Sequence, residues 1–265
     1  MQTLLWMAGV YLTICLAAYF GNRIFMYFPD SARYSPAEAG LEGVTEIEIA
    51  ASDGEKLVAW HAPAKSGKPT ILYFHGNAGN AAGRAPKIDI MRANGNGVFY
   101  LNNRGYGGSS GRPSEQRNVA DALAGYDYLT GLGVKPEETV LYGESLGSGQ
   151  AVKLAAQRPV RAVILEAPLT STVDVGKRTY FFLPLRLILT DQFRNEENIG
   201  AVTKPLLVLH GQQDTVIPVD HGRRVFAAAN DPKSLELFPA AGHSDLFDFG
   251  AWDKVEAFLA SLPGR

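Results

Sequence analysis

The sequence predicts an α/β fold, built as a mostly parallel, twisted sheet with helices on both faces. Three observations favour it. Continuous apolar runs of five or six residues alternate with helical patterns along most of the chain. One Gly-x-Ser-x-Gly stretch, residues 143–147, lies between such a run and a helical pattern. The length of 265 residues suits one domain of this class with a small insertion.

Composition and charge exclude several classes of function. The net charge is −2, so no basic excess is present to neutralise phosphates, and we expect no nucleic-acid partner. Cys15 is the single cysteine of the sequence, which leaves neither a disulfide within the chain nor a thiol metal site. The chemistry must therefore come from ordinary side chains.

The first 22 residues contain no charged side chain and are long enough to cross a bilayer, which needs ~20 apolar residues in a helix. We predict a single-pass, uncleaved membrane anchor over residues 1–28. A cleaved signal peptide is the rival interpretation, but its basic first region is missing. A buried or interfacial helix is the third. Arg23 and Arg33 follow the segment, which favours a cytoplasmic side for the remaining chain.

Residues 29–43 are rich in Pro, Ser, Gly and charge, and we interpret them as a linker. The catalytic domain is predicted to cover residues 44–265. It opens with an alternating strand, a turn and a returning strand. The expected strands are residues 44–49, 56–61, 69–74, 97–101, 139–142, 160–165, 205–210 and 234–238. The expected helices are residues 81–93, 115–129, 150–156 and 246–262, with a further helix opening after Pro218.

The insertion is expected at about residues 169–201, where the alternation of strand and helix patterns stops. Within it, residues 180–189 are strongly apolar for a segment outside the sheet. Two interpretations stay open for this segment: it packs on the core, or it forms a lid that lines an acyl pocket or touches the bilayer. The glycine-dense loop at residues 102–111 carries Arg104, which either lines the pocket or fastens the loop.

Ser145 is the predicted nucleophile. A serine on a sharp turn between strand and helix adopts a strained backbone, and Gly143 and Gly147 keep that turn free of clashes. The same turn places the backbone N–H of Leu146 at a helix N-terminus, where negative charge is favoured. The alternative is an ordinary glycine-rich turn without chemistry.

Three stretches, residues 74–80, 103–109 and 143–147, make the chain resemble the α/β-hydrolase superfamily. With the apolar N-terminus, the chain is similar to the membrane-anchored abhydrolase-domain branch, which includes protein depalmitoylases. The resemblance implies a catalytic triad in the chain order Ser145, Asp214, His243 and an oxyanion hole made by the N–H groups of Asn77 and Leu146.

The resemblance also ranks the rival residues. Glu166 is the second candidate for the acid, and Asp214 is preferred because this fold places the acid on the loop after the later strand. His75 is expected to hold its loop. The remaining histidines are expected to be poorer bases than His243; they are His61, His210 and His221.

The implied function is a serine hydrolase that cleaves carboxylic esters or thioesters through an acyl-enzyme, with small-molecule or lipid-like acyl substrates. A serine nucleophile argues against the dehalogenase and epoxide-hydrolase members, which use a carboxylate there. No metal or organic cofactor is needed for this reaction. A serine peptidase and a non-catalytic binding protein of the same fold are the alternatives.

Overall fold

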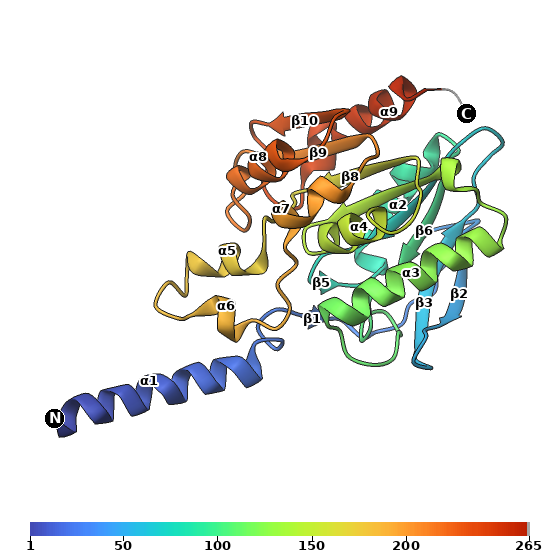
Figure 1. Ribbon diagram of the computed structural model, residues 1–265. Coiled ribbons are helices and arrows are strands. Elements are labelled where there is room, and N and C mark those ends of the chain that lie inside the picture. The colour runs from blue at the N-terminus through green and yellow to red at the C-terminus, as the bar shows by residue number, and fades with distance from the viewer. Residues whose placement is uncertain (264–265) are drawn as a thin grey trace.

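A central eight-stranded sheet organises the computed structural model, which describes residues 1–263. The strand order is β10-β9-β8-β7-β4-β6-β3-β2 (Figure 1). The strands of this sheet are β2 (Thr45–Ala50), β3 (Lys56–Ala62), β4 (Thr70–Phe74), β6 (Gly97–Leu101), β7 (Thr139–Glu144), β8 (Ala162–Glu166), β9 (Leu206–Gly211) and β10 (Lys233–Phe238). Strand β3 runs antiparallel to β2 and β6, and the other neighbours are parallel. The predicted mostly parallel sheet is confirmed.

Helices cover both faces of the sheet because the central strands are apolar on both sides. In β4, Leu72 and Phe74 pack into one hydrophobic cluster, while Ile71 and Tyr73 pack into the other. Helices α3, α4 and α8 supply the first cluster, and α2 and α9 supply the second. Their bounds are α2 (Ala85–Ala93), α3 (Glu115–Gly131), α4 (Gly147–Ala155), α8 (Val219–Ala228) and α9 (Ala251–Ser261).

The predicted final helix at residues 246–262 is wrong in one respect. A 3₁₀ turn, η4 (Leu246–Phe249), precedes α9, and the two are separated by Gly250 in the left-handed region with φ of 80°. Glycine adopts this conformation without a steric penalty, so the chain changes direction there. Three further 3₁₀ turns are η1 (Ala82–Arg84), η2 (Pro136–Glu138) and η3 (Ile199–Ala201).

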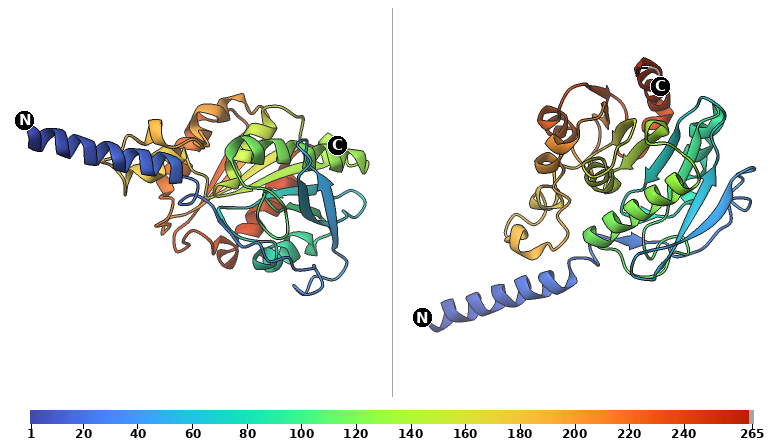
Figure 2. Two further views of the ribbon diagram at one scale, coloured as in Figure 1. Left: turned by 90° about the horizontal axis from the view of Figure 1, so that it is seen from below. Right: turned by 45° about the vertical axis from the view of Figure 1, so that its right-hand side comes forward.

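The N-terminal helix α1 (Gln2–Gly21) projects from the body of the molecule (Figures 1 and 2). Its mean hydropathy is 1.8, and none of its apolar stretch is buried against the rest of the described chain. It is one helix that is long and apolar enough to cross a membrane. The insertion between β8 and β9 forms a small cap beside it, made of α5 (Thr172–Lys177), α6 (Leu185–Ile188) and α7 (Asn195–Asn198).

The segment at residues 29–43 packs along the domain. Strand β1 (Phe28–Pro29) pairs in parallel with β5 (Ala78–Gly79), in the loop after β4. The Asp30 carboxylate accepts a hydrogen bond from the Asn80 side chain at 2.8 Å. Leu41 is buried in the cluster on the α2 and α9 face. The segment therefore ties α1 to the sheet at several points.

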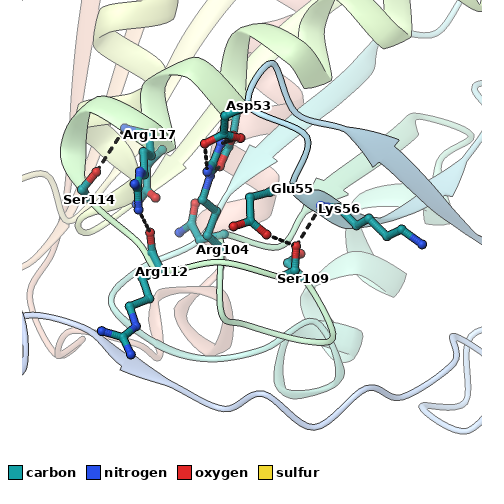
Figure 3. A network of polar contacts seen from close by, with 12 residues as sticks. Asp53, Glu55, Lys56, Arg104, Ser109, Arg112, Ser114 and Arg117 are labelled. Carbon is teal, nitrogen blue, oxygen red and sulfur yellow. Dashed lines mark hydrogen bonds and ion pairs between the residues drawn. The ribbon is translucent and has the colours of Figure 1, made fainter.

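Arg104 fastens the glycine-dense loop, as one of the two predicted alternatives required. Its guanidinium is 1% exposed and donates to Asp121 of α3 at 2.7 Å and to Asp53 of the β2–β3 turn at 2.5 and 2.9 Å (Figure 3). Two carboxylates thus hold one loop against a helix and a turn. Arg104 does not line the pocket beside Ser145.

Candidate active site

Ser145 lies on the turn between β7 and α4 in a strained conformation, with φ of 52°. Such a residue costs about 1–3 kcal/mol unless its surroundings hold it there. The Ser145 N–H donates to the carbonyl of Glu166 at 2.8 Å, and the Ser148 hydroxyl donates to the Ser145 carbonyl at 2.5 Å. A Cβ at position 147 would lie 2.2 Å from the Phe74 carbonyl oxygen, so only glycine fits there.

The structure brings the three predicted residues into one hydrogen-bonded row. His243 Nε2 lies 3.1 Å from Ser145 Oγ, and His243 Nδ1 lies 2.7 Å from Asp214 Oδ2. The three side chains follow β7, β9 and β10, whose carboxyl ends meet at the same edge of the sheet. The turn, the parallel order of the strands and the two loops therefore bring the three side chains together.

Asp214 is held as a carboxylate. Its Oδ1 accepts the N–H groups of Val216 and Ile217, both at 2.8 Å. Burial acts to raise the pKa of Asp214, but hydrogen bonds from His210 and His243 outweigh it and lower the pKa well below its usual range. A permanent negative charge beside His243 favours the tautomer that carries the proton on Nδ1.

Glu166 and the other histidines do not join the row. The Glu166 carboxylate binds Lys87 Nζ at 2.6 Å and the Tyr142 hydroxyl at 2.5 Å. His75 lies 2.7 Å from the Gly76 carbonyl through Nδ1 and accepts the Asn103 N–H through Nε2 at 3.0 Å. Burial lowers the pKa of His75 to about 3, so its ring stays neutral and fixed.

Two other candidate bases, His210 and His221, are also held by hydrogen bonds away from Ser145. His210 Nε2 lies 2.8 Å from the Ile217 carbonyl and 3.4 Å from Asp214 Oδ2, so it supports the loop that carries the acid. His221 Nδ1 accepts the Thr170 N–H at 3.2 Å. His61 belongs to β3, on the other half of the sheet.

Asn77 and Leu146 line the same pocket as Ser145. Within residues 1–263, neither backbone N–H donates to a protein acceptor. The Gly76 carbonyl, which shares its peptide plane with the Asn77 N–H, lies 2.7 Å from His75 Nδ1, and the Asn77 carbonyl accepts the Phe28 N–H at 2.8 Å and the Tyr106 hydroxyl at 2.7 Å. Asn77 and Leu146 thus leave two backbone donors without a protein acceptor among the residues that line the pocket of Ser145.

The pocket over Ser145 has a volume of about 270 Å³ and a mostly apolar lining. The cap and the loop after β9 supply apolar side chains, among them Leu169, Val175, Leu185, Leu189 and Ile217. The segment after α1 supplies Asn22, Phe25 and Met26. These three residues were not predicted, because they belong to the expected anchor at residues 1–28 and no signal in the sequence pairs them with the cap.

Comparisons with known proteins agree with this architecture. The Hydrolase_4 family, described as "Serine aminopeptidase, S33", matches residues 65–190. The protein Rv2307c of Mycobacterium tuberculosis is 38% identical over 227 residues, which cover 84% of this chain and 81% of that protein. The alpha/beta hydrolase domain-containing protein 17B of Xenopus laevis is 37% identical over 250 residues, which cover 91% of this chain and 83% of the relative. The chain belongs to the α/β-hydrolase superfamily.

Solved structures of other proteins share the fold of this α/β hydrolase. The Pyrococcus furiosus esterase Pf2001 superposes with a TM-score of 0.72 at 20% identity, covering 89% of this chain and 99% of that one. The resemblance stated from the three sequence stretches is confirmed. General hydrolase activity follows from the family.

A closed network of charged side chains lies behind the Ser145 turn of this α/β hydrolase. Glu144 binds Arg84 at 2.8 Å, and Lys87 lies 3.8 Å from Glu144 and 2.6 Å from Glu166. The hydroxyl of Tyr73 donates to Glu144. Glu144, the second residue of the Gly-x-Ser-x-Gly stretch, is therefore fixed by Arg84, Lys87 and Tyr73, which no pattern in the sequence indicated.

Proposed function

We propose that the protein is a serine hydrolase that cleaves carboxylic esters or thioesters through an acyl-enzyme intermediate. The observation that supports it most is the row in which Ser145 Oγ lies 3.1 Å from His243 Nε2 and His243 Nδ1 lies 2.7 Å from Asp214. These distances are within hydrogen-bond reach for proton transfer.

In this mechanism His243 accepts the Ser145 proton at Nε2 while Oγ attacks the substrate carbonyl carbon. The carbonyl oxygen becomes negative and accepts hydrogen bonds from the N–H groups of Asn77 and Leu146. Asp214 stabilises the protonated imidazole. His243 then donates its proton to the leaving alcohol or thiol, whose bond to the acyl carbon breaks. A water molecule, deprotonated by His243, releases the acid and restores Ser145.

The pocket favours an apolar, lipid-like acyl group. Burial of each methylene contributes about 0.8 kcal/mol, and the lining offers aliphatic and aromatic side chains for it. The family description leaves a serine peptidase as the alternative. An aminopeptidase needs a negative group for the substrate amine, and no carboxylate belongs to the described lining of this pocket. Ester or thioester substrates therefore fit the lining better.

We also assign α1 as an uncleaved single-pass anchor within residues 1–28, followed by the segment 29–43 and the hydrolase domain 44–265, with its cap at about 169–201. The apolar length of α1 supports this assignment. Arg23 and Arg33 favour the cytoplasmic side for the domain. Protease protection of the full chain in sealed vesicles tests it: a catalytic domain digested only after lysis of inside-out vesicles contradicts the assignment.

Labelling with a fluorophosphonate probe tests the chemistry. We expect one probe adduct on Ser145 in the full chain and none in Ser145→Ala. The p-nitrophenyl esters of increasing acyl length then measure kcat/KM for the acyl group. Labelling of folded protein at another residue, or none at all, would overturn the proposed function.

A further inference from the structure

The segment that follows α1 turns back onto the pocket of Ser145. Asn22 is buried, and Phe25 and Met26 line the pocket beside it. The Met26 carbonyl accepts a hydrogen bond from the Asn77 side chain at 3.2 Å. Residues 22–26 therefore touch both the pocket and the loop that carries one of the two unengaged N–H donors.

A bidentate ion pair holds this segment against the cap. The Arg23 guanidinium donates to both oxygens of Asp191, at 2.9 and 3.0 Å, and the Tyr27 hydroxyl donates to the same carboxylate at 3.1 Å. Asp191 is 2% exposed, so it depends on these partners for its charge. The Thr190 hydroxyl adds a hydrogen bond to the Asn22 side chain at 3.2 Å. The position of residues 22–27 is thus fixed relative to the cap.

The cap also contacts α1 well before its C-terminal end. The Tyr11 hydroxyl donates to the carbonyl of Phe182 at 2.8 Å, and α6 lies beside α1 (Figures 1 and 2). Tyr11 is ten residues before Gly21, which is about 15 Å along the helix axis. That is half of the ~30 Å hydrocarbon core that α1 is long enough to cross. With α1 spanning the bilayer as proposed and Gly21 at its edge, the tip of the cap would lie at the depth of the bilayer interior.

Three apolar side chains of this tip are exposed and suit hydrocarbon, and the exposed cations Lys177 and Arg186 lie beside them. Phe181 is 81% exposed, Phe182 52% and Leu187 78%. Exposed aromatic and aliphatic groups that lie together mark an interaction surface. The Phe182 carbonyl already has its partner in Tyr11, as a backbone group in lipid requires. Continuity with α1 identifies the occupant of this surface as the acyl chains of the membrane.

We propose that the acyl chain of an ester held in the bilayer enters the pocket between α1 and the cap, with residues 22–26 as one wall of the acyl site. This inference rests on the proposed serine hydrolase. The pocket of about 270 Å³ is at the lower limit of ligand sites, which span ~300–1,000 Å³. The pocket accommodates the carbons next to the ester, and the rest of a long chain stays among Phe25, Phe181 and the lipid.

The first experiment places a larger side chain in the wall of the acyl site. The full chain carrying Met26→Trp, reconstituted in lipid nanodiscs, is compared across p-nitrophenyl esters from butyrate to palmitate. The matched control is Met7→Trp, the same change on an α1 residue that is 58% exposed and outside the pocket. We expect Met26→Trp to move the preferred acyl length to shorter esters, by about fourfold in kcat/KM for each methylene that no longer fits. The control should keep the original profile.

The second experiment tests entry from the bilayer. Phe181→Glu and Leu187→Glu are compared with Leu132→Glu, which is 50% exposed and follows the far end of α3, about 25 Å from the cap contact of Glu115. The substrates are a fluorogenic palmitoyl ester embedded in vesicles and a soluble butyrate ester. We expect the two cap variants to lose about tenfold or more on the embedded ester relative to the butyrate, and Leu132→Glu to lose nothing on either.

Two results would overturn the inference: an unchanged length profile in Met26→Trp, or equal losses on embedded and soluble esters in the cap variants. Thermal melting and fluorophosphonate labelling of each variant separate misfolding from a real effect. If the full chain hydrolyses butyrate and labels at Ser145 while these selective effects are missing, the serine hydrolase stands and only the bilayer entry fails. If no variant or parent labels, the proposed function itself fails.

Discussion

Buried carboxylates lie on both sides of Ser145, and their partners differ. Asp214 faces His243, whose side chain is 18% exposed and whose Nδ1 lies 2.7 Å from the carboxylate. Glu144 and Glu166 face Arg84 and Lys87, which are permanent cations within a closed network. Burial acts to raise the pKa of Glu144, but Lys87 and Arg84 outweigh it and lower the pKa below its usual range.

In the proposed mechanism, this contrast separates the one carboxylate that serves chemistry from the two that serve structure. A carboxylate contributes to proton transfer when its partner reaches the reacting atom and changes its own charge. In the proposed mechanism His243 meets both conditions, because its Nε2 lies 3.1 Å from Ser145 Oγ and takes up the proton of that hydroxyl. Arg84 and Lys87 meet neither, so Glu144 and Glu166 hold the turn of Ser145 in place.

Ser145→Ala tests the row of Ser145, His243 and Asp214, and it has the largest expected effect. Loss of the hydroxyl should reduce ester turnover by about 10⁶-fold, since no other group replaces the nucleophile. Steady-state hydrolysis of p-nitrophenyl butyrate measures it, with Ser244→Ala on the neighbouring loop as the control. Folded Ser145→Ala protein that retains a tenth of the activity would contradict the assignment.

Asp214→Asn and Glu166→Gln sharpen the comparison between the two sides. Asp214→Asn should lower kcat by about 10⁴-fold, because the neutral amide leaves His243 in the wrong tautomer. Glu166→Gln should lower stability and affect kcat much less, because Glu166 binds Lys87 and Tyr142 and not His243. The two variants are compared in kcat and in urea unfolding. The opposite ranking in kcat would move the acid to Glu166.

Arg84→Met tests the structural side. It leaves the buried Glu144 with Lys87 at 3.8 Å as its remaining cation, so we expect a loss of about 3–5 kcal/mol in the free energy of unfolding. Arg194→Met is the matched control, because Arg194 is 49% exposed in a surface pair with Glu197 and should cost at most about 1 kcal/mol. Equal losses in the two variants, measured in urea, would show that the network contributes no more than a surface pair.

His75→Gln is expected to have the smallest effect on stability, and the size of this effect depends on pH. The pKa of His75 is about 3 in the folded chain against 6.5 unfolded, so between these values only the unfolded chain takes up the proton. The contribution of His75 to the free energy of unfolding is therefore full above pH 6.5. It falls by about 1.4 kcal/mol for each pH unit below that value. The stability gap between parent and variant should therefore narrow by about 2 kcal/mol from pH 7 to pH 5. A constant gap in urea titrations would mean that His75 protonates equally in both states.

The sequence predicted the sheet and the row at its edge because these depend on local patterns and chain order. Continuous apolar runs predicted β4, β7, β8 and β9, and parallel strands bring the loops after them to one edge. The resemblance to α/β hydrolases then assigned Ser145, Asp214 and His243 to loops at this edge. The break at Gly250 was not, because a glycine inside an apolar helical pattern also occurs in continuous helices.

Contacts between distant segments were not predictable in the same way. Arg23 and Asp191 are separated by 168 residues, and charge alone does not select one partner among 27 acidic residues. The network of Arg84, Lys87 and Glu144 likewise joins a helix to the central strands through side chains that read as ordinary surface charges in the sequence. Such pairs depend on packing geometry, which a single sequence does not encode as a pattern.

The hydrogen bonds of Arg23 and Tyr27 to Asp191 have a practical consequence for protein engineering. Shortening the chain to start at Pro29, to obtain a freely soluble enzyme, would keep Ser145, His243 and Asp214 but remove both Arg23 and Tyr27. The buried Asp191 carboxylate would then lack its cation, which typically costs about 3–5 kcal/mol. Such a shortened chain would have a loosened cap, and the proposed acyl site would be open to water on one side. Soluble variants for screening should therefore retain residues 22–28 and replace only the exposed apolar side chains of α1.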